Sequence, residues 1–315
     1  VGGDFQGRGD LPHAGVVTVD KESSINVSAQ RQGDGGTAIV WSDHFTAYYG
    51  QAEARGGSEG GNGGLIETSS KNVVDLAPTF IDASAAKGKG GNWLIDPRNV
   101  TISDAAPSHV GAGPNFAPDN SGPPGESSNV QVSTIEAALN AGTSVTVTTA
   151  GSGTGQPGHI TVLDSIEKTG GADATLTLTA MGNITINELD TGGDPLVISS
   201  SAGALGVILQ ANADGGAGHA ATGSGSVFLN GSIVTNGGVF TSSGVNFTST
   251  STGTVDTTGA TNGAITLNHT GAVSIGGTMT GGAIDIDAGS TISLGADLIT
   301  SAGTVRFRDP VILTD

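Results

Sequence analysis

Three stretches of the same form decide the fold: GDGGTAIVWSD at residues 33–43, GNGGLIETSSK at residues 61–71 and GKGGNWLIDPR at residues 88–98. They begin 28 and 27 residues apart, and each joins a glycine-rich turn to a short apolar run. Matching runs precede two of the turns, INVSA at residues 25–29 and FIDASA at residues 80–85. Val, Ile and Thr alternating with polar residues are typical of strands with one buried face. The repeated unit is therefore strand, glycine turn, strand.

The C-terminal half repeats over a shorter distance. ITL at residues 265–267, IDI at 284–286 and VRF at 305–307 start 19 and 21 residues apart, with VSI at 273–275 and ISL at 292–294 between them. Repeats of about 20 residues predict coils of a solenoid that stack on one another. Each core residue, if replaced by Asp, should destabilise its coil strongly. The expected core positions are Ile39, Leu65, Leu94, Val227, Ile265, Ile284 and Val305.

This pattern predicts an all-β solenoid in which glycine supplies positive φ at the corners. Outward Asn, Ser and Thr side chains are expected to form ladders along the stack. One segment interrupts it, because residues 104–129 contain five prolines and no periodic strand, which indicates an excursion. A short helix should follow in VSTIEAALNAG, with Ser133 or Thr134 as its N-cap and Gly142 at its end. The predicted divisions are residues 1–103, 104–142 and 143–315.

Composition excludes several classes of function. The net charge is −18, and no Lys or Arg occurs between Lys168 and Arg306, so nucleic acids and anionic membranes are not expected partners. The absence of Cys excludes disulfides and thiolate chemistry. No apolar run is long enough to span a membrane or act as a signal peptide. The opening VGGDF, without Met, leads us to expect a processed product or a segment of a longer chain.

The order of motifs in the first 103 residues resembles a known family. GGDFQGRG, INVSAQRQGDGGTAIVWSD, GGSEGGNGGLIETSSKNV and FIDASAAKGKGGNWLIDPRNVTI are similar to the haemagglutinin-type solenoid of two-partner-secreted exoproteins, the filamentous haemagglutinins and high-molecular-weight adhesins. STIEAALNAGTSVTVTTAG resembles the segment that follows in that family. The resemblance implies a right-handed parallel β-helix, secreted through an outer-membrane partner pore and displayed as a fibre on the bacterial cell surface. The family's amino-terminal secretion domain has no matching stretch here, so the resemblance implies a shaft segment.

Two kinds of short motif could mediate binding or modification. Arg8, Gly9 and Asp10 form an RGD tripeptide, which could be recognised by integrin-type receptors, although its Gly-rich surroundings favour a solvated turn. Six Asn-x-Ser/Thr sequons could be glycosylated, but the count is only mildly above that expected from composition, which favours ladder positions. The sequon asparagines are Asn26, Asn99, Asn183, Asn230, Asn246 and Asn268.

Residues for catalysis or metal binding are sparse. Asp285 and Asp287 lie at i and i+2 of one strand and could share a proton or bind a cation, yet they are better explained as solvated positions flanking buried isoleucines. No local Lys or Arg is expected to act as a lyase-type base. Metal-ligand spacing is lacking among the six histidines, and the aromatic residues Trp41, Trp93, Tyr48 and Tyr49 suit packing better than sugar stacking. The histidines are His13, His44, His109, His159, His219 and His269.

The function expected from these observations is structural and non-enzymatic: the shaft of a secreted, surface-exposed adhesin or fibre that mediates attachment or aggregation. No cofactor, metal or nucleic acid is expected. The expected partners are the outer-membrane secretion pore and an unidentified cell-surface glycan or protein receptor, and end-to-end self-association is conceivable. Three alternatives stay open: a self-assembling extracellular filament, a polysaccharide-active β-helix enzyme, and an ice- or crystal-binding face built on Thr-x-Thr pieces.

Overall fold

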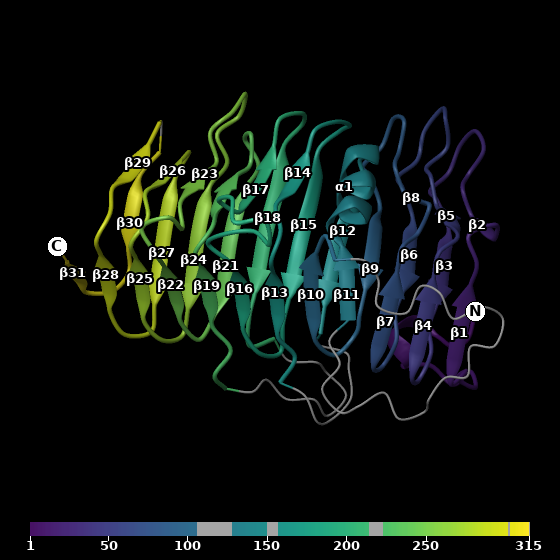
Figure 1. Ribbon diagram of the computed structural model, residues 1–315. Coiled ribbons are helices and arrows are strands. Elements are labelled where there is room, and N and C mark those ends of the chain that lie inside the picture. The colour runs from purple at the N-terminus through teal and green to yellow at the C-terminus, as the bar shows by residue number, and fades with distance from the viewer. Residues whose placement is uncertain (106–127, 150–156, 214–222, 302, 315) are drawn as a thin grey trace.

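The computed structural model describes residues 1–315 except 106–127, 150–156, 214–222, 302 and 315. The described residues form a parallel β-solenoid whose coils run from the N-terminus at one end of the stack to the C-terminus at the other (Figure 1). Two long sheets run along this stack, and a third side is divided between a three-stranded and a six-stranded sheet. All strand pairs within these sheets are parallel, as the coil-length repeats predict. The all-β parallel solenoid is therefore confirmed.

Each sheet collects one strand from each successive coil. The ten-stranded sheet contains β3 (Thr37–Val40), β6 (Leu65–Thr68), β9 (Asn92–Ile95), β12 (Ser144–Thr148), β15 (Ala174–Thr179), β18 (Leu205–Gln210), β21 (Phe240–Gly244), β24 (Ile265–His269), β27 (Ile284–Ala288) and β30 (Val305–Phe307). The twelve-stranded sheet contains β1 (Val16–Val19), β4 (Phe45–Tyr48), β7 (Val73–Leu76), β11 (Ser128–Gln131), β10 (Val100–Ser103), β13 (Ile160–Val162), β16 (Ile184–Ile186), β19 (Val227–Leu229), β22 (Phe247–Ser249), β25 (Val273–Ile275), β28 (Ile292–Leu294) and β31 (Val311–Leu313).

The third side is shorter and divided. Its three-stranded sheet contains β2 (Ser24–Asn26), β5 (Gln51–Glu53) and β8 (Phe80–Asp82). Its six-stranded sheet contains β14 (Ile166–Lys168), β17 (Val197–Ser200), β20 (Ser232–Val234), β23 (Val255–Asp256), β26 (Met279–Gly281) and β29 (Leu298–Thr300). The single α-helix of the described residues, α1 (Val132–Ala141), packs against β8 on one side and β14 on the other. One helix thus takes the place of a strand between the two sheets.

A narrow aliphatic core runs the length of the stack. Inward residues alternate with outward ones along each strand, as in β27, where Ile284 and Ile286 are buried and the aspartates beside them are half-buried. Val227 and Ile265 are fully buried, so these two core predictions and that for Ile284 are confirmed. Val305 is half-buried and packs against the core from the last coil.

The predicted register is wrong in the first three coils. Ile39 and Leu65 are only half-buried, because Val40 and Ile66 point into the core instead. Leu94 is buried, but it lies on the outer face of β9, outside the core cluster. A shift of one residue moves a whole strand to its other face. The sequence misled us here because β6 and β9 are covered on both faces, which removes the alternation of apolar and polar residues.

One strand is out of sequence order within the twelve-stranded sheet. β11 lies between β7 and β10, although it follows β10 in the chain. Val130 of β11 pairs with Leu76 on one side and Ile102 on the other. The chain thus forms β10 first and later returns to place β11 between β7 and β10. Most of the predicted excursion, residues 106–127, lies outside the described residues, and its last two residues belong to β11.

The helix starts earlier than predicted. Its N-cap is Gln131, so the prediction of Ser133 or Thr134 is wrong. The Thr134 hydroxyl instead donates to the carbonyl of Gln131 from inside the first turn. Gly142 ends the helix with φ 85°, as predicted, because a left-handed residue here is best supplied by glycine. Ile135 and Leu139 are fully buried and anchor the helix to the core.

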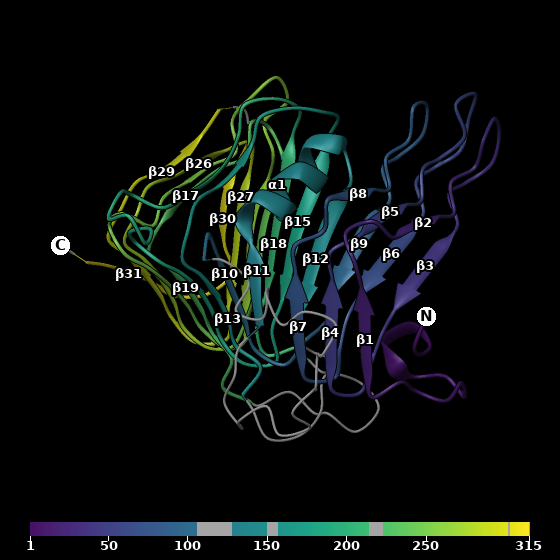
Figure 2. The same cartoon turned by 45° about the vertical axis from the view of Figure 1, so that its right-hand side comes forward.

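The glycine motifs form the bases of three stacked arms, residues 27–36, 54–64 and 83–91. Each arm closes on itself through one backbone hydrogen bond, such as that from the N–H of Gly64 to the carbonyl of Ala54, at 2.7 Å. The arms project beyond the strands at the N-terminal end of the stack, on the right of Figure 2. A Cβ added at Gly63 would overlap the carbonyl oxygen of Ala83. Glycine is needed here chiefly for close backbone approach, more than for the positive φ that we expected.

Candidate functional site

A polar cleft of about 850 Å³ lies beside the three arms. All three coils contribute to it, and the end of α1 closes one side. Its lining is made of small and hydrogen-bonding side chains: Asn26, Ser28, Ala29, Gln30, Arg55, Gly56, Ser58, Ser84, Ala85, Ala86 and Ala141. Aromatic residues are missing from this lining. The cleft therefore offers hydrogen bonds and one guanidinium group, with no stacking surface for a sugar ring.

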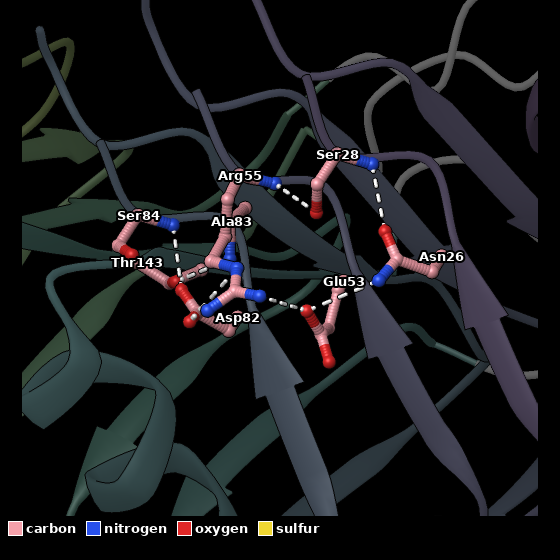
Figure 3. A network of polar contacts seen from close by, with 8 residues as sticks. All are labelled: Asn26, Ser28, Glu53, Arg55, Asp82, Ala83, Ser84 and Thr143. Carbon is pink, nitrogen blue, oxygen red and sulfur yellow. Dashed lines mark hydrogen bonds and ion pairs between the residues drawn. The ribbon is translucent and has the colours of Figure 1, made fainter. Parts of the chain in front are cut away.

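Three polar residues stack across the strands next to this cleft. Asn26, Glu53 and Asp82 occupy the same register position in β2, β5 and β8 (Figure 3). The Asn26 amide donates to Glu53 at 3.3 Å. The Arg55 guanidinium lies 2.6 Å from Glu53 and 3.9 Å from Asp82. One cation thus compensates two stacked carboxylates that would otherwise repel each other.

Backbone groups hold the same coils together from the next position along. Ser28 accepts a hydrogen bond from the backbone N–H of Arg55 at 2.9 Å. The Asp82 carboxylate accepts the N–H of Ser84 at 2.8 Å, and the Thr143 hydroxyl after α1 accepts the N–H of Ala83 at 2.7 Å (Figure 3). The charged groups beside the cleft are therefore engaged by neighbouring coils. This polar network therefore links three successive coils and Thr143, which follows α1.

The RGD tripeptide lies on the surface next to the first coil. Arg8, Gly9 and Asp10 are all exposed and follow the short 3-10 helix η1 (Phe5–Gly7). The Asp4 carboxylate accepts the N–H of Leu11 at 3.2 Å, which fixes the bend from the other side. The structure thus places the tripeptide in an exposed bend. Recognition of this tripeptide by a receptor stays a prediction.

Two buried carboxyl groups lie beneath η1. Glu67 of β6 has no exposed surface and Asp96 is 3% exposed. Both are on the outer side of the stack, where the backbone and side chain of Gln6 donate to them. Burial raises the pKa of Glu67 to about 7, and the charge of Asp96 adds to this, while Gln6, Ser69 and Arg8 oppose it. Sequence analysis missed this pair because the acids are not near each other in the chain.

Three of the six sequon asparagines belong to a polar ladder. Asn99, Asn183 and Asn246 each precede a strand of the twelve-stranded sheet and accept a backbone N–H from the next coil. His159 and Ser226 fill the same position in the intervening coils. The five hydrogen bonds measure 2.8 to 3.3 Å and link six successive coils. The expected asparagine and serine ladder is therefore present, and these sequons have a structural role.

The other three sequon asparagines lie elsewhere. Asn268 is exposed on β24, and Asn230 is half-buried at the end of β19. Asn26 is exposed and belongs to the network beside the cleft. Asn26 and Asn268 are the most accessible of the six for glycosylation, which stays untested.

The predicted carboxylate pair is accompanied by a cation. The Arg308 guanidinium from the last coil binds Asp285 through two hydrogen bonds of 2.6 and 3.0 Å and lies 3.6 Å from Asp287. This ion pair lowers the pKa of Asp285. The expectation that no Arg lies nearby is wrong, because Arg306 and Arg308 follow in the next coil and register brings them alongside. The Arg308 guanidinium thus links the two aspartates to the next coil.

Packing engages both tryptophans, Tyr48, His13 and His269. Trp93 and Tyr48 have no exposed surface, and Trp41 is 5% exposed with His13 against it at 4.5 Å between ring centres. His269 is buried against Phe247, and burial lowers its pKa to about 4. Packing of the tryptophans is confirmed. No group of three or more potential metal ligands is found among the described residues, which exclude His109 and His219.

A second ladder was missed by sequence analysis. Side-chain donors at or just after the ends of β14, β17, β20, β23 and β29 bond to carbonyls of the turn that follows, as in Thr235 to Gly238 at 2.6 Å. Lys168 fills this position in β14, where its buried ammonium group donates to the carbonyls of Gly170, Gly171 and Ala202. The sequence signal that could have revealed these donors is a Lys, Ser or Thr followed two or three residues later by Gly. The other members described are Ser200, Thr257 and Thr300.

Comparison with known proteins identifies no relative. No protein-family model matches the chain, and a search of curated proteins finds no significant match. Within the described residues, no helix has the length and apolar character needed to cross a membrane.

Proposed function

We propose that this chain is the non-enzymatic shaft of a secreted, surface-exposed adhesin or fibre of the haemagglutinin type, which supports attachment or aggregation. The observation that carries the proposal is the unbroken ladder of side-chain hydrogen bonds from Asn99 to Ala272, which ties six coils into one rod. Such distributed cohesion suits a part that bears load and holds other parts at a distance. The arms and the exposed bend at residues 8–10 are the surfaces that this shaft presents.

The partners follow from the same proposal. Passage through an outer-membrane pore requires an unfolded chain, and a chain without Cys carries no disulfide to block it. The bacterial cell surface is the proposed location. A cell-surface glycan or protein is the proposed receptor.

Attachment tests this function directly. Beads that carry the purified chain should adhere to host cells more than beads that carry a β-solenoid enzyme of similar size. Electron microscopy should show rods with the ten coils of the ten-stranded sheet spanning about 45 Å at the usual strand spacing of about 4.8 Å. Equal adhesion of both bead types would refute the adhesive role, whereas globular particles would refute the shaft.

A second candidate function is a self-assembling extracellular filament. The last coil exposes apolar side chains, with Ile312 at 51% and Leu313 at 78% exposure. An open strand edge of this kind can pair with another chain. Rods that lengthen with protein concentration, and that Ile312→Lys shortens, would favour the filament over a monomeric shaft.

A further inference from the structure

Residues 4–10 cover two carboxyl groups on adjacent coils. The backbone N–H of Gln6 donates to both oxygens of Glu67, at 3.1 and 3.2 Å. Its side-chain amide donates to Asp96 at 3.1 Å. A single residue therefore connects the covering segment to β6 and to the corner after β9.

The connecting residue is held in an unfavourable conformation. Gln6 has φ 51° and ψ 28°, in the left-handed region that residues other than glycine seldom adopt. Such a conformation persists where surrounding contacts impose it, and it is often found at clamps and switches. The neighbours of Gln6 differ: Phe5 is exposed, whereas Gly7 lies so close to the Trp41 ring that an added Cβ would overlap it.

The carboxyl groups make this contact sensitive to protons. Glu67 is fully buried while the segment covers it, and Asp96 places a second acid on the neighbouring coil. Arg8 of the covering segment supplies a positive charge that acts on Glu67, and Ser69 on the sheet side donates a hydrogen bond to it. His13 and Asp43 pair with each other at 3.4 Å at the far end of the segment. If the segment lifted away, Glu67 would meet water.

We propose that residues 4–10 form a proton-controlled cover, closed while Glu67 is protonated and released when Glu67 ionises. Release frees Arg8, Gly9 and Asp10 from the sheet and uncovers Glu67 and Asp96. The cover could therefore control how the tripeptide is presented, which rests on the proposed adhesive function. The proton linkage itself does not depend on that function.

The direction of the effect follows from linkage. The pKa of Glu67 is about 7 with the cover closed, against an ordinary value of 4.5 when exposed. The closed state therefore binds the proton more tightly, so its advantage is complete below pH 4.5 and is lost as the pH rises through 7. The ratio of closed to open molecules should fall by roughly 300-fold over this interval, the factor that corresponds to the two pKa values.

The test uses a spin label on the segment. Because the chain has no Cys, Leu11→Cys provides a unique site for a nitroxide, and its mobility can be followed by electron paramagnetic resonance from pH 4.5 to 8.5. The mobile fraction should increase with pH. Glu67→Gln, which cannot ionise, should hold the fraction low and independent of pH. Glu59→Gln, which removes an exposed acid paired with Arg31, should behave like the parent chain.

Several outcomes would overturn the proposal. They are a pH-independent label in the parent chain and a pH response that survives in Glu67→Gln. If Glu67→Gln does not fold, Gln6→Ala decides: it keeps the backbone donor and the cost of the left-handed conformation but loses the bond to Asp96. It should raise the mobile fraction at every pH and keep the pH response, and loss of that response would contradict the proposal. A cover that opens as expected on a chain that adheres to no cell would sink the adhesive function alone.

Discussion

The Nδ1 atom of His159 accepts a hydrogen bond from the backbone N–H of Asn183, 2.8 Å away on the next coil. In the coils on either side, asparagine oxygens occupy the same place in the ladder. His159 therefore serves as a substitute for asparagine, and it can do so only while Nδ1 is unprotonated. This relationship connects the stability of the middle of the solenoid to pH.

Replacing His159 with Asn should make the solenoid less sensitive to acid. Burial lowers the pKa of His159 from its ordinary 6.5, so its contribution to stability is present above pH 6.5 and is lost as the pH falls through the lower pKa of the folded state. Urea unfolding at pH 7 and pH 5 should show a smaller loss of stability for His159→Asn than for the parent chain. An equal loss in both would show that the ladder does not depend on the neutral ring. The remaining acid sensitivity should come partly from His269, whose pKa is about 4.

Asparagines of the same sequon type should differ in their importance. Asn183→Ala leaves the N–H of Ser226 without its acceptor and should lower the free energy of unfolding by about 1–3 kcal/mol. Asn268→Ala, at an exposed position, should change it by no more than about 0.5 kcal/mol. Urea denaturation of the two variants, both made without glycosylation, provides the comparison. Similar losses in both would mean that the ladder adds nothing beyond side-chain burial.

The polar network beside the cleft should contribute to stability through Arg55. Its removal in Arg55→Ala leaves Glu53 and Asp82 stacked without their cation, and we expect a loss of about 1–3 kcal/mol. Arg31→Ala, which breaks an exposed pair with Glu59 on the outside of the arms, should cost at most about 0.5 kcal/mol. The two variants are compared by urea unfolding at low salt. If Arg31→Ala lowered the free energy of unfolding as much as Arg55→Ala, the stabilising role of this network would be contradicted.

The register of the first coils can be checked with two adjacent substitutions. Val40→Asp buries an unpaired charge in the core, whereas Ile39→Asp places it on the half-buried outer face. Val40→Asp should therefore lower the melting temperature much more, or prevent folding of this coil. The yield of folded protein, judged by circular dichroism, is the measurement for both variants. The reverse order would restore the register that the sequence alone predicted.

The sequence predicted the coils where strand alternation is clean. Ile265 and Ile284 stand in triplets whose spacing matches one coil, and both are core residues of neighbouring strands. Prediction failed at Leu94, because the inward and outward faces of β9 are both covered and the sequence no longer alternates between apolar and polar residues. It failed also at the carboxylates, because Asp285 and Arg308 meet only when one coil stacks on the next.

What the sequence determined by itself is the period of the chain. Glycines at fixed spacing and short Val, Ile and Thr triplets predict a repeated coil, and Gly142 ends α1 because glycine adopts its φ of 85° most readily. The tertiary structure decided what stacks on what: the return of β11 to the place between β7 and β10, the cover of Gln6 over Glu67, and the ladder through His159. Those contacts join residues more than 20 positions apart. Local propensity carries no information about them, since they arise only when the coils come into register.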